Sequence, residues 1–402
     1  MKSNKLFSWV FMLSACALLA IGRVYDERLV IAGFNLVLFI CLFFLVSIVF
    51  LLFSIKKMVL SKSKVLFYMF YLSVLVLTPI LWMLFNVTEF GLEKYLNFCL
   101  IVVPVSIVII EKYDREDVVK TLYILLGVTC FLALLSSIGL SVSDRVDGRM
   151  AALGGGPIVF ARWMGFGIIS LFLLPLKVKS RFKYVLIFIF FLLALASGSR
   201  GPILSLLITF LIYVFLNFNK VIVKVSFGFI LLISIVIFSA AGKQLTKVGK
   251  FDRVFMNVSK KGWSKQSTST RTNLAVGSFI ILQNYPLGVG AGNWQEISNQ
   301  LRPTHLMPLE YPHNLFLEVA CEYGLPTLLI LILMFVYVLY LSYNKMLNYR
   351  SNASSLYPLL FYLFIFFLLN SLVSGMLNDS RLLFIIISFI LIHKPLLISV
   401  DE

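Results

Sequence analysis

Apolar stretches separated by short charged or turn-forming segments make up most of this 402-residue chain. Most of these stretches approach the length of about 20 residues that a helix needs to cross the hydrocarbon core of a membrane. The pattern therefore predicts an all-α polytopic membrane protein with about twelve transmembrane helices. The apolar runs lie at about 6–22, 30–55, 65–86, 95–110, 118–140, 157–176, 184–198, 202–217, 224–242, 324–343, 356–374 and 381–394.

The connection between the ninth and tenth runs is long enough to form a domain of its own. We expect helices 1–9 in residues 1–242, an outward-facing loop in residues 243–323 and helices 10–12 in residues 324–402. Within the loop, the periodicity predicts two helices separated by a glycine-rich turn segment. The first helix runs from Arg271 to Gln283, capped by Ser269 or Thr270, with Leu274, Ser278, Ile281 and Leu282 near one face; the turns cover Tyr285 to Trp294; the second helix runs from Asn314 to Glu322 and breaks at Gly324 and Pro326.

The composition and the placement of charge agree with a membrane protein. Hydrophobic residues make up 60% of the chain and charged residues 13%, against about 25% charged residues in soluble proteins. Of the Lys and Arg residues, 18 fall on the side of the two termini and 8 in the short loops opposite, so both termini are expected in the cytoplasm. The formal net charge of +17 is then partly a topology signal, and nucleic acid is not an expected partner.

The long outward loop is strongly basic. Residues 243–312 contain 9 Lys and Arg against Asp252, Glu296 and Glu310. Such a surface attracts an anionic ligand or a lipid head group. A solvated basic loop lying on anionic phospholipid explains the same charge.

Cysteine and cofactor chemistry are not indicated. The five cysteines lack the paired spacing of disulfide or zinc frameworks, so they are expected to act as small hydrophobic residues. The segment Leu13 to Cys16 resembles a lipoprotein cleavage site, but the apolar run continues to Ile21, which favours a first spanning helix. We find no Walker loop or His-Glu-x-x-His motif, and we expect neither a metal nor a cofactor.

Two arginines stand at predicted helix starts on the outward side. Residues 197–202, Ser-Gly-Ser-Arg-Gly-Pro, join the seventh and eighth runs with almost no loop, and Arg271 follows the capping residues of the first loop helix. Backbone N–H groups and the helix dipole favour an anion at such positions, and one guanidinium group can bind two phosphate oxygens at once. Arg200 and Arg271 together would hold a diphosphate. A hairpin arginine that reaches lipid phosphate, and a solvated helix start, are the alternatives.

His313 stands just before the second loop helix. Histidine titrates near neutral pH, which suits a general base for a sugar hydroxyl. Glu318 or Glu322 would orient it or be an ordinary surface acid, and a purely structural histidine is the alternative. Further substrate-binding candidates are Arg149 and Arg162 beside the glycine-rich start of the sixth run, Asn314 and Glu318 beside His313, and Arg381 at the last outward turn.

Taken together, these segments resemble the O-antigen ligase and O-antigen polymerase superfamily of membrane glycosyltransferases. The resemblance is most specific over about 197–335. It is carried by Ser-Gly-Ser-Arg-Gly at 197–201, Ser-Thr-Arg at 269–271, the Asn284, Pro286, Gly288, Gly290 and Gly292 stretch, and Pro-His-Asn at 312–314 with Glu318, Glu322 and Gly324.

The resemblance implies an inverting, metal-independent enzyme of the bacterial inner membrane with a catalytic periplasmic loop. Such enzymes take a glycan from undecaprenyl diphosphate and pass it to an acceptor hydroxyl during O-antigen and lipopolysaccharide assembly. Arg200 and Arg271 would bind the departing diphosphate, and His313 would accept the proton from the attacking hydroxyl. Membrane lipid and a polysaccharide chain-length regulator are further partners that it implies.

The resemblance leaves two possible acceptors, which correspond to two reactions. A polymerase passes the glycan to another lipid-linked repeat unit, whereas a ligase passes it to lipid A core. The Tyr-Pro-His-Asn-Leu-Phe-Leu-Glu sequence at 311–318 leans towards a polymerase.

Two functions that involve no glycan transfer are the alternatives. A polysaccharide flippase or transporter tends to show two related halves and broken helices near the membrane midplane, whereas the polar candidates of this chain gather on one outward face. A non-catalytic assembly partner would tolerate the loss of His313.

Overall fold

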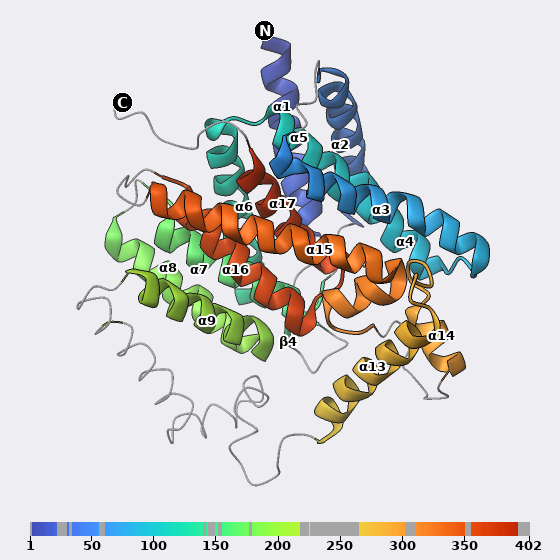
Figure 1. The fold of residues 1–402 in the computed structure, drawn as a ribbon. Helices are drawn as coiled ribbons and strands as arrows, with labels where there is room; N and C mark the ends of the chain where they lie inside the picture. The colour runs from blue at the N-terminus through green and yellow to red at the C-terminus, as the bar shows by residue number, and fades with distance from the viewer. Residues whose placement is uncertain are drawn as a thin grey trace.

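The computed structural model describes residues 2–21, 30–31, 34–55, 61–139, 142–143, 149–151, 155–176, 179–217, 225, 265–301, 311–349 and 355–392 (Figure 1). Helices dominate these residues, which confirms the predicted all-α class. Two short antiparallel pairs accompany them, β1 (Val30–Ile31) with β2 (Phe34–Asn35) and β3 (Val142–Ser143) with β4 (Arg149–Met150). The helices are α1 (Lys2–Ala20), α2 (Leu36–Phe53), α3 (Lys62–Leu84), α4 (Glu89–Asn97), the π-helical η2 (Phe98–Val102), α5 (Val103–Lys112), α6 (Arg115–Ser137), α7 (Pro157–Leu173), α8 (Ser180–Ala196), α9 (Arg200–Asn217), α13 (Lys265–Asn284), α14 (Trp294–Leu301), α15 (Leu315–Asn348), α16 (Tyr357–Ser374), the 3₁₀ turn η3 (Asn378–Ser380) and α17 (Arg381–Leu391).

The helices follow the apolar runs of the sequence. Each run except the ninth, 224–242, coincides with a described helix, and the ninth lies outside the described residues apart from Val225. Within the described chain, seven helical segments are long and apolar enough to cross a membrane. They are α2, α3, the continuous segment from α4 to α5, α6, α9, α15 and α16. The count of twelve and the division at residues 242 and 323 stay predictions.

Polar side chains set the starts of several helices. Asn35 caps α2 by accepting from the N–H groups of Val37 and Leu38. Asp114 and Asp117 form a reciprocal capping box at the start of α6. These caps satisfy backbone donors that have no partner in the first helical turn.

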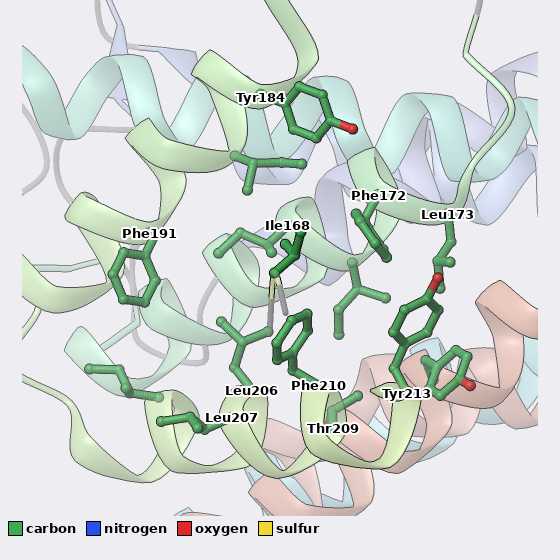
Figure 2. Close-up of a pocket in the computed structure, with 15 residues that line it drawn as sticks. Ile168, Phe172, Leu173, Tyr184, Phe191, Leu206, Leu207, Thr209, Phe210 and Tyr213 are labelled. Atoms are coloured by element: carbon green, nitrogen blue, oxygen red, sulfur yellow. The ribbon is translucent and has the colours of Figure 1, made fainter. Parts of the chain in front are cut away.

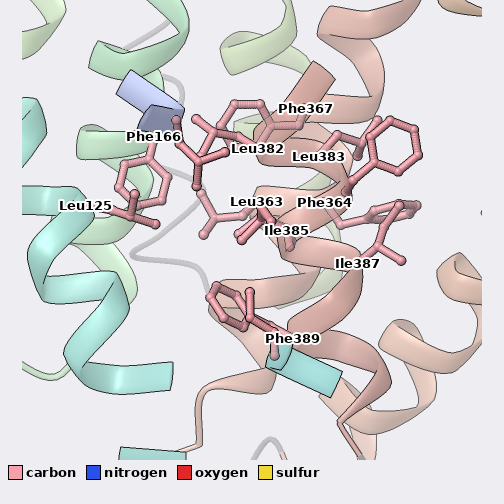
Figure 3. Packing of buried hydrophobic residues seen from close by; sticks show 14 of the residues in the cluster. Leu125, Phe166, Leu363, Phe364, Phe367, Leu382, Leu383, Ile385, Ile387 and Phe389 are labelled. Atoms are coloured by element: carbon pink, nitrogen blue, oxygen red, sulfur yellow. The ribbon is translucent and has the colours of Figure 1, made fainter. Parts of the chain in front are cut away.

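The centre of the described bundle is the antiparallel pair α16 and α17 (Figure 3). All eleven residues of α17 are buried, as expected of a helix that is apolar all round. Helices α7, α9 and α15 pack around α16, and α5 packs against α17. The turn that joins the two central helices is therefore surrounded by several other elements.

The outer helices expose apolar side chains. On α2, Leu38, Phe39 and Leu42 are exposed, and on α9 Leu204 and Phe215 are exposed. Bands of exposed leucine and phenylalanine on long apolar helices are suited to lipid rather than to water.

Candidate functional site

The junction of α16 and α17 is held by side chains from other elements over residues 372–379, which comprise the last three residues of α16, the connection 375–377 and the first two residues of η3. The Asn314 amide donates to the Leu372 carbonyl at 2.9 Å. The Arg162 guanidinium donates to the carbonyls of Ser374 at 2.9 Å and Asp379 at 3.1 Å. The last carbonyls of α16 lack helical partners, so these side chains satisfy them, and the arginine also complements the negative end of the helix dipole. Hereafter this segment is called the 372–379 turn.

Arg162 is buried rather than open to the solvent. Its residue is 4% exposed, and it projects from α7 into the junction of α16 and η3. An arginine near the start of a predicted spanning helix must reach a polar partner. Main-chain carbonyls of the 372–379 turn are that partner.

His313 lies immediately before α15 in an uncommon backbone conformation. Its φ of 56° lies in the left-handed region, which few residues other than glycine adopt. Asn314 fixes the segment, because its side-chain oxygen accepts from the N–H groups of Phe316 and Leu317 while its amide holds Leu372. The half-buried His313 ring lies 4.2 Å from the Tyr311 ring, between centroids.

Arg200 is the first residue of α9 and has an exposed side chain. Gly198 turns the chain with a φ of 65°, and the Ser199 N–H donates to the Ser197 hydroxyl. The next residue, Gly201, packs on the 372–379 turn: a Cβ on Gly201 would lie 3.1 Å from the Val373 side chain.

The 372–379 turn thus brings two of the predicted catalytic segments together. Gly201, the neighbour of Arg200, contacts Val373, and Asn314, the neighbour of His313, binds Leu372. Segments more than a hundred residues apart in the sequence border adjacent residues of one turn.

Arg271 lies on α13. The predicted start of this helix was wrong. The helix begins at Lys265, so the exposed Arg271 lies in the second turn, and Ser269 and Thr270 are helical rather than caps. The preceding polar residues contain no glycine or proline that would stop the helix. The predicted inward face is confirmed, since Leu274, Ser278 and Ile281 are buried and Leu282 is partly buried. Arg271 precedes Leu274 by one turn on that face.

Two further arginines have different surroundings. Arg381 donates to the carbonyls of Asn378 at 2.9 Å, Leu18 at 3.1 Å and Ile21 at 3.2 Å, so it joins the end of α1 to the start of α17. Arg149 lies in β4 opposite Ser143, and its side chain lies outside the described part of the structure.

A buried ion-pair cluster lies one turn beyond His313. Lys94 from α4 pairs with both Glu318 and Glu322 of α15, and the three side chains are 1%, 0% and 3% exposed. The second oxygen of Glu318 accepts the Leu377 N–H at 2.8 Å, which adds another bond to the 372–379 turn. Glu318 and Glu322 are therefore core residues, not surface acids.

Sequence reasoning missed Lys94. Two glutamates four residues apart lie on one helix face, and this spacing in an apolar context was the available signal for a buried cation. The partner is on another helix, so the spacing does not identify it. The Lys94, Glu318 and Glu322 cluster carries one net negative charge if all three groups are ionised.

The glycine-rich segment serves to join helices. Pro326 leaves the helix without an N–H for the Glu322 carbonyl, and Gly324 breaks α15 with a φ of 84°. The N–H of Gly290 binds that carbonyl at 2.9 Å, and the Leu325 N–H donates to the Pro286 carbonyl at 2.9 Å. The break predicted at Gly324 and Pro326 is confirmed.

Close backbone contact explains the glycines at 288 and 292. A Cβ on Gly288 would lie 2.7 Å from the Gly324 nitrogen, and one on Gly292 would lie 2.3 Å from the Gly91 Cα. Asn293 and Trp82 add hydrogen bonds between this segment and the end of α3. Residues 285–293 therefore fix the bend of α15 against α3 and α4.

A comparison with known protein families finds a match. Residues 184–332 match the family model Wzy_C, described as O-Antigen ligase. The match spans α8, α9, α13, α14 and the first half of α15, and so it includes Arg200, Arg271 and His313. No curated protein matched the chain.

Proposed function

We propose that the chain transfers a glycan from undecaprenyl diphosphate to an acceptor hydroxyl, because residues 184–332 match the O-antigen ligase family model. One observation carries the proposal: the Arg200 hairpin and the His313 segment both attach to the 372–379 turn. The residues next to these two contacts carry a guanidinium and an imidazole, groups that suit a diphosphate leaving group and a hydroxyl nucleophile, and we propose that they serve one reaction centre.

The proposed chemistry is a single displacement at the anomeric carbon. The acceptor oxygen bonds to that carbon from one face while the bond from the carbon to the phosphate oxygen breaks on the other, which inverts the configuration. His313 takes the proton of the acceptor hydroxyl. Arg200 and Arg271 stabilise the charge that develops on the departing diphosphate, a task that preorganised cationic donors perform without a metal.

Four of the predicted substrate-binding residues receive a different role in this proposal. Arg162, Asn314, Glu318 and Arg381 all bond to main-chain atoms around the 372–379 turn. We assign them to positioning the Arg200 and His313 segments. Arg149 keeps its proposed role in substrate binding.

The proposal places the reaction at the periplasmic face of the bacterial inner membrane. Residues 243–323 form the periplasmic loop, and both termini lie in the cytoplasm. The positive-inside distribution of Lys and Arg supports this orientation. Fusion of an alkaline phosphatase reporter within residues 302–310 should give high activity, and a fusion after residue 402 should give none.

Polymerisation is the reaction that we propose, with attachment to lipid A core as the alternative. Deleting the gene and running the surface polysaccharide on a gel distinguishes the two reactions. A single attached repeat unit in place of long chains identifies a polymerase. Loss of all attached chains identifies a ligase, and unchanged chains refute both.

Two substitutions test the catalytic assignment. His313→Ala should lower transfer by about 10²–10⁴-fold, the usual contribution of a general base, with His393→Ala as control. Arg200→Lys should also be defective because an ammonium lacks the planar fork that binds two phosphate oxygens, with Arg181→Lys at the other end of the same hairpin as control. Normal transfer by purified His313→Ala protein would remove the base assignment.

A further inference from the structure

A cavity of about 210 Å³ lies between α7, α8 and α9 (Figure 2). Its walls are almost entirely aliphatic and aromatic, with Ile168 from α7, Phe191 from α8 and Leu206 and Phe210 from α9 among them. The cavity is not sealed inside the bundle, because its lining residues Phe172 and Tyr184 are 40% and 61% exposed. An apolar molecule in the surrounding lipid therefore has access to it.

The cavity follows α9 away from Arg200. Its α9 wall begins at Ile203 and extends to Tyr213. At the helical rise of 1.5 Å per residue, these positions lie roughly 5–20 Å from Arg200 along the helix axis. A cation thus stands at one end of α9, and an apolar cavity occupies the next three turns.

This order of charge and apolar surface matches one kind of ligand, a lipid whose anionic head group is bound at Arg200. A diphosphate at the start of α9 would direct its attached hydrocarbon along the cavity, where burial of apolar surface adds about 25 cal/mol per Å². A lipid held elsewhere by its head group would gain the apolar contacts alone. A diphosphate carries more negative charge than the single phosphodiester of a phospholipid, so charge complementarity at Arg200 favours the diphosphate lipid over bulk phospholipid.

We propose that the cavity between α7, α8 and α9 binds the isoprenoid chain of the donor, in the isoprene units nearest its diphosphate. The proposal rests on the proposed function, because that function supplies a diphosphate-linked isoprenoid as the substrate. It assigns the donor lipid to the α9 side of the 372–379 turn. The acceptor then approaches from the His313 side.

Two substitutions on α9 separate the cavity from the outer surface of the helix. Leu206→Trp introduces a large side chain into the cavity wall. Leu204→Trp is the matched control, because Leu204 is 53% exposed and does not line the cavity. Both changes replace a leucine of the same helix by tryptophan, so an effect on insertion or helix stability alone would be similar.

Transfer is measured with two donors that carry the same glycan diphosphate on an undecaprenyl chain or on a methyl group, which is too short to enter the cavity. We expect Leu206→Trp to raise the KM for the undecaprenyl donor by about tenfold, which corresponds to about 1.4 kcal/mol, with kcat unchanged. Leu204→Trp should leave KM unchanged, and the methyl donor should show a much smaller effect of Leu206→Trp. Equal KM values for the two variants, or the same rise with both donors, would overturn the proposal.

Labelling distinguishes the lipid source and does not depend on transfer. An undecaprenyl diphosphate analogue with a photoreactive group in its first isoprene units should label α7, α8 or α9 in the full chain. Unlabelled undecaprenyl diphosphate should compete, whereas phosphatidylglycerol vesicles should not. Equal competition by phosphatidylglycerol would show a general lipid site and overturn the proposal. Specific labelling of a chain that transfers no glycan would refute the proposed function and leave the lipid site standing.

Discussion

Lys94 is expected to be the most sensitive lysine of the described chain. The substitution Lys94→Met keeps most of the side-chain volume and removes the cation that pairs with Glu318 and Glu322. The two carboxylates would then stay side by side in the core with no opposite charge. Removal of one partner from a buried ion pair leaves an uncompensated charge, which costs far more than the pair itself contributes.

The burial of Lys94, Glu318 and Glu322 determines how much stability Lys94→Met should lose. With all three side chains at most 3% exposed, Lys94→Met should lower the free energy of unfolding by about 3–5 kcal/mol. The pair between Lys120 and Glu116 is the solvent-exposed reference, with side chains 37% and 74% exposed. Loss of such an i,i+4 pair costs about 0.3–0.5 kcal/mol, so Lys120→Met should be nearly silent.

Denaturant titration of the purified proteins in detergent, followed by far-ultraviolet circular dichroism, measures the difference. Adding Glu318→Gln and Glu322→Gln to Lys94→Met removes the uncompensated charges and should recover most of the loss. A Lys94→Met protein as stable as Lys120→Met would refute the reasoning, because the cluster would then not be buried as charges.

Lys94→Met also tests whether the ion-pair cluster supports the 372–379 turn. Lys64 forms a second buried ion pair, which joins α3 to α5 through Glu111 at 2.8 Å. Lys64→Met should therefore lower stability without a specific loss of transfer. At a temperature where both proteins remain folded, Lys94→Met should show the lower kcat, because Glu318 also holds the Leu377 N–H.

Three further changes probe contacts around the site. Asn314→Ala removes both a helix cap worth about 1 kcal/mol and the amide that tethers Leu372, whereas Asn314→Asp keeps the cap oxygen and loses only the tether. Thermal unfolding should show stability restored in Asn314→Asp while transfer stays reduced, and wild-type transfer by Asn314→Asp would contradict the tether. Gly292→Ala introduces a Cβ 2.3 Å from the backbone of α4 and should lower the free energy of unfolding by more than about 1 kcal/mol. Gly127→Ala is the control, because its Cβ meets nothing within 4 Å; an unchanged melting temperature of Gly292→Ala would show that the contact relaxes freely. Arg162→Met leaves two turn carbonyls without their donor, which should cost about 1–3 kcal/mol and reduce transfer in the same assays, and full activity would remove its positioning role.

The sequence predicted the helices well because lipid imposes a strong local pattern. Each apolar run within the described residues identified a helix, and Gly324 with Pro326 identified the break in α15, whereas α14 and most of α4 lie outside the predicted helices. The start of α13 was wrong because serine and threonine are only weak helix-start signals where no breaker precedes them. Such boundaries depend on which face of the helix finds a packing partner.

The contacts of the site were less predictable. Sequence reasoning selected Arg162 and Glu318 as polar residues of interest, but their partners are main-chain atoms and a lysine distant in the sequence. Main-chain carbonyls carry no residue identity, and Lys94 lies in a stretch with no distinctive motif. Only the three-dimensional packing, which brings α4 to α15 and α7 to the junction of α16 and η3, reveals these bonds.

The bonds that hold the 372–379 turn have an evolutionary consequence. Asn314, Arg162 and Glu318 reach the carbonyls of Leu372, Ser374 and Asp379 and the N–H of Leu377. None of these bonds uses a side chain of the turn itself. Leu372, which is 38% exposed, can therefore vary without releasing these anchors, whereas the buried side chains of Ser374, Met376, Leu377 and Asn378 are constrained by packing as well.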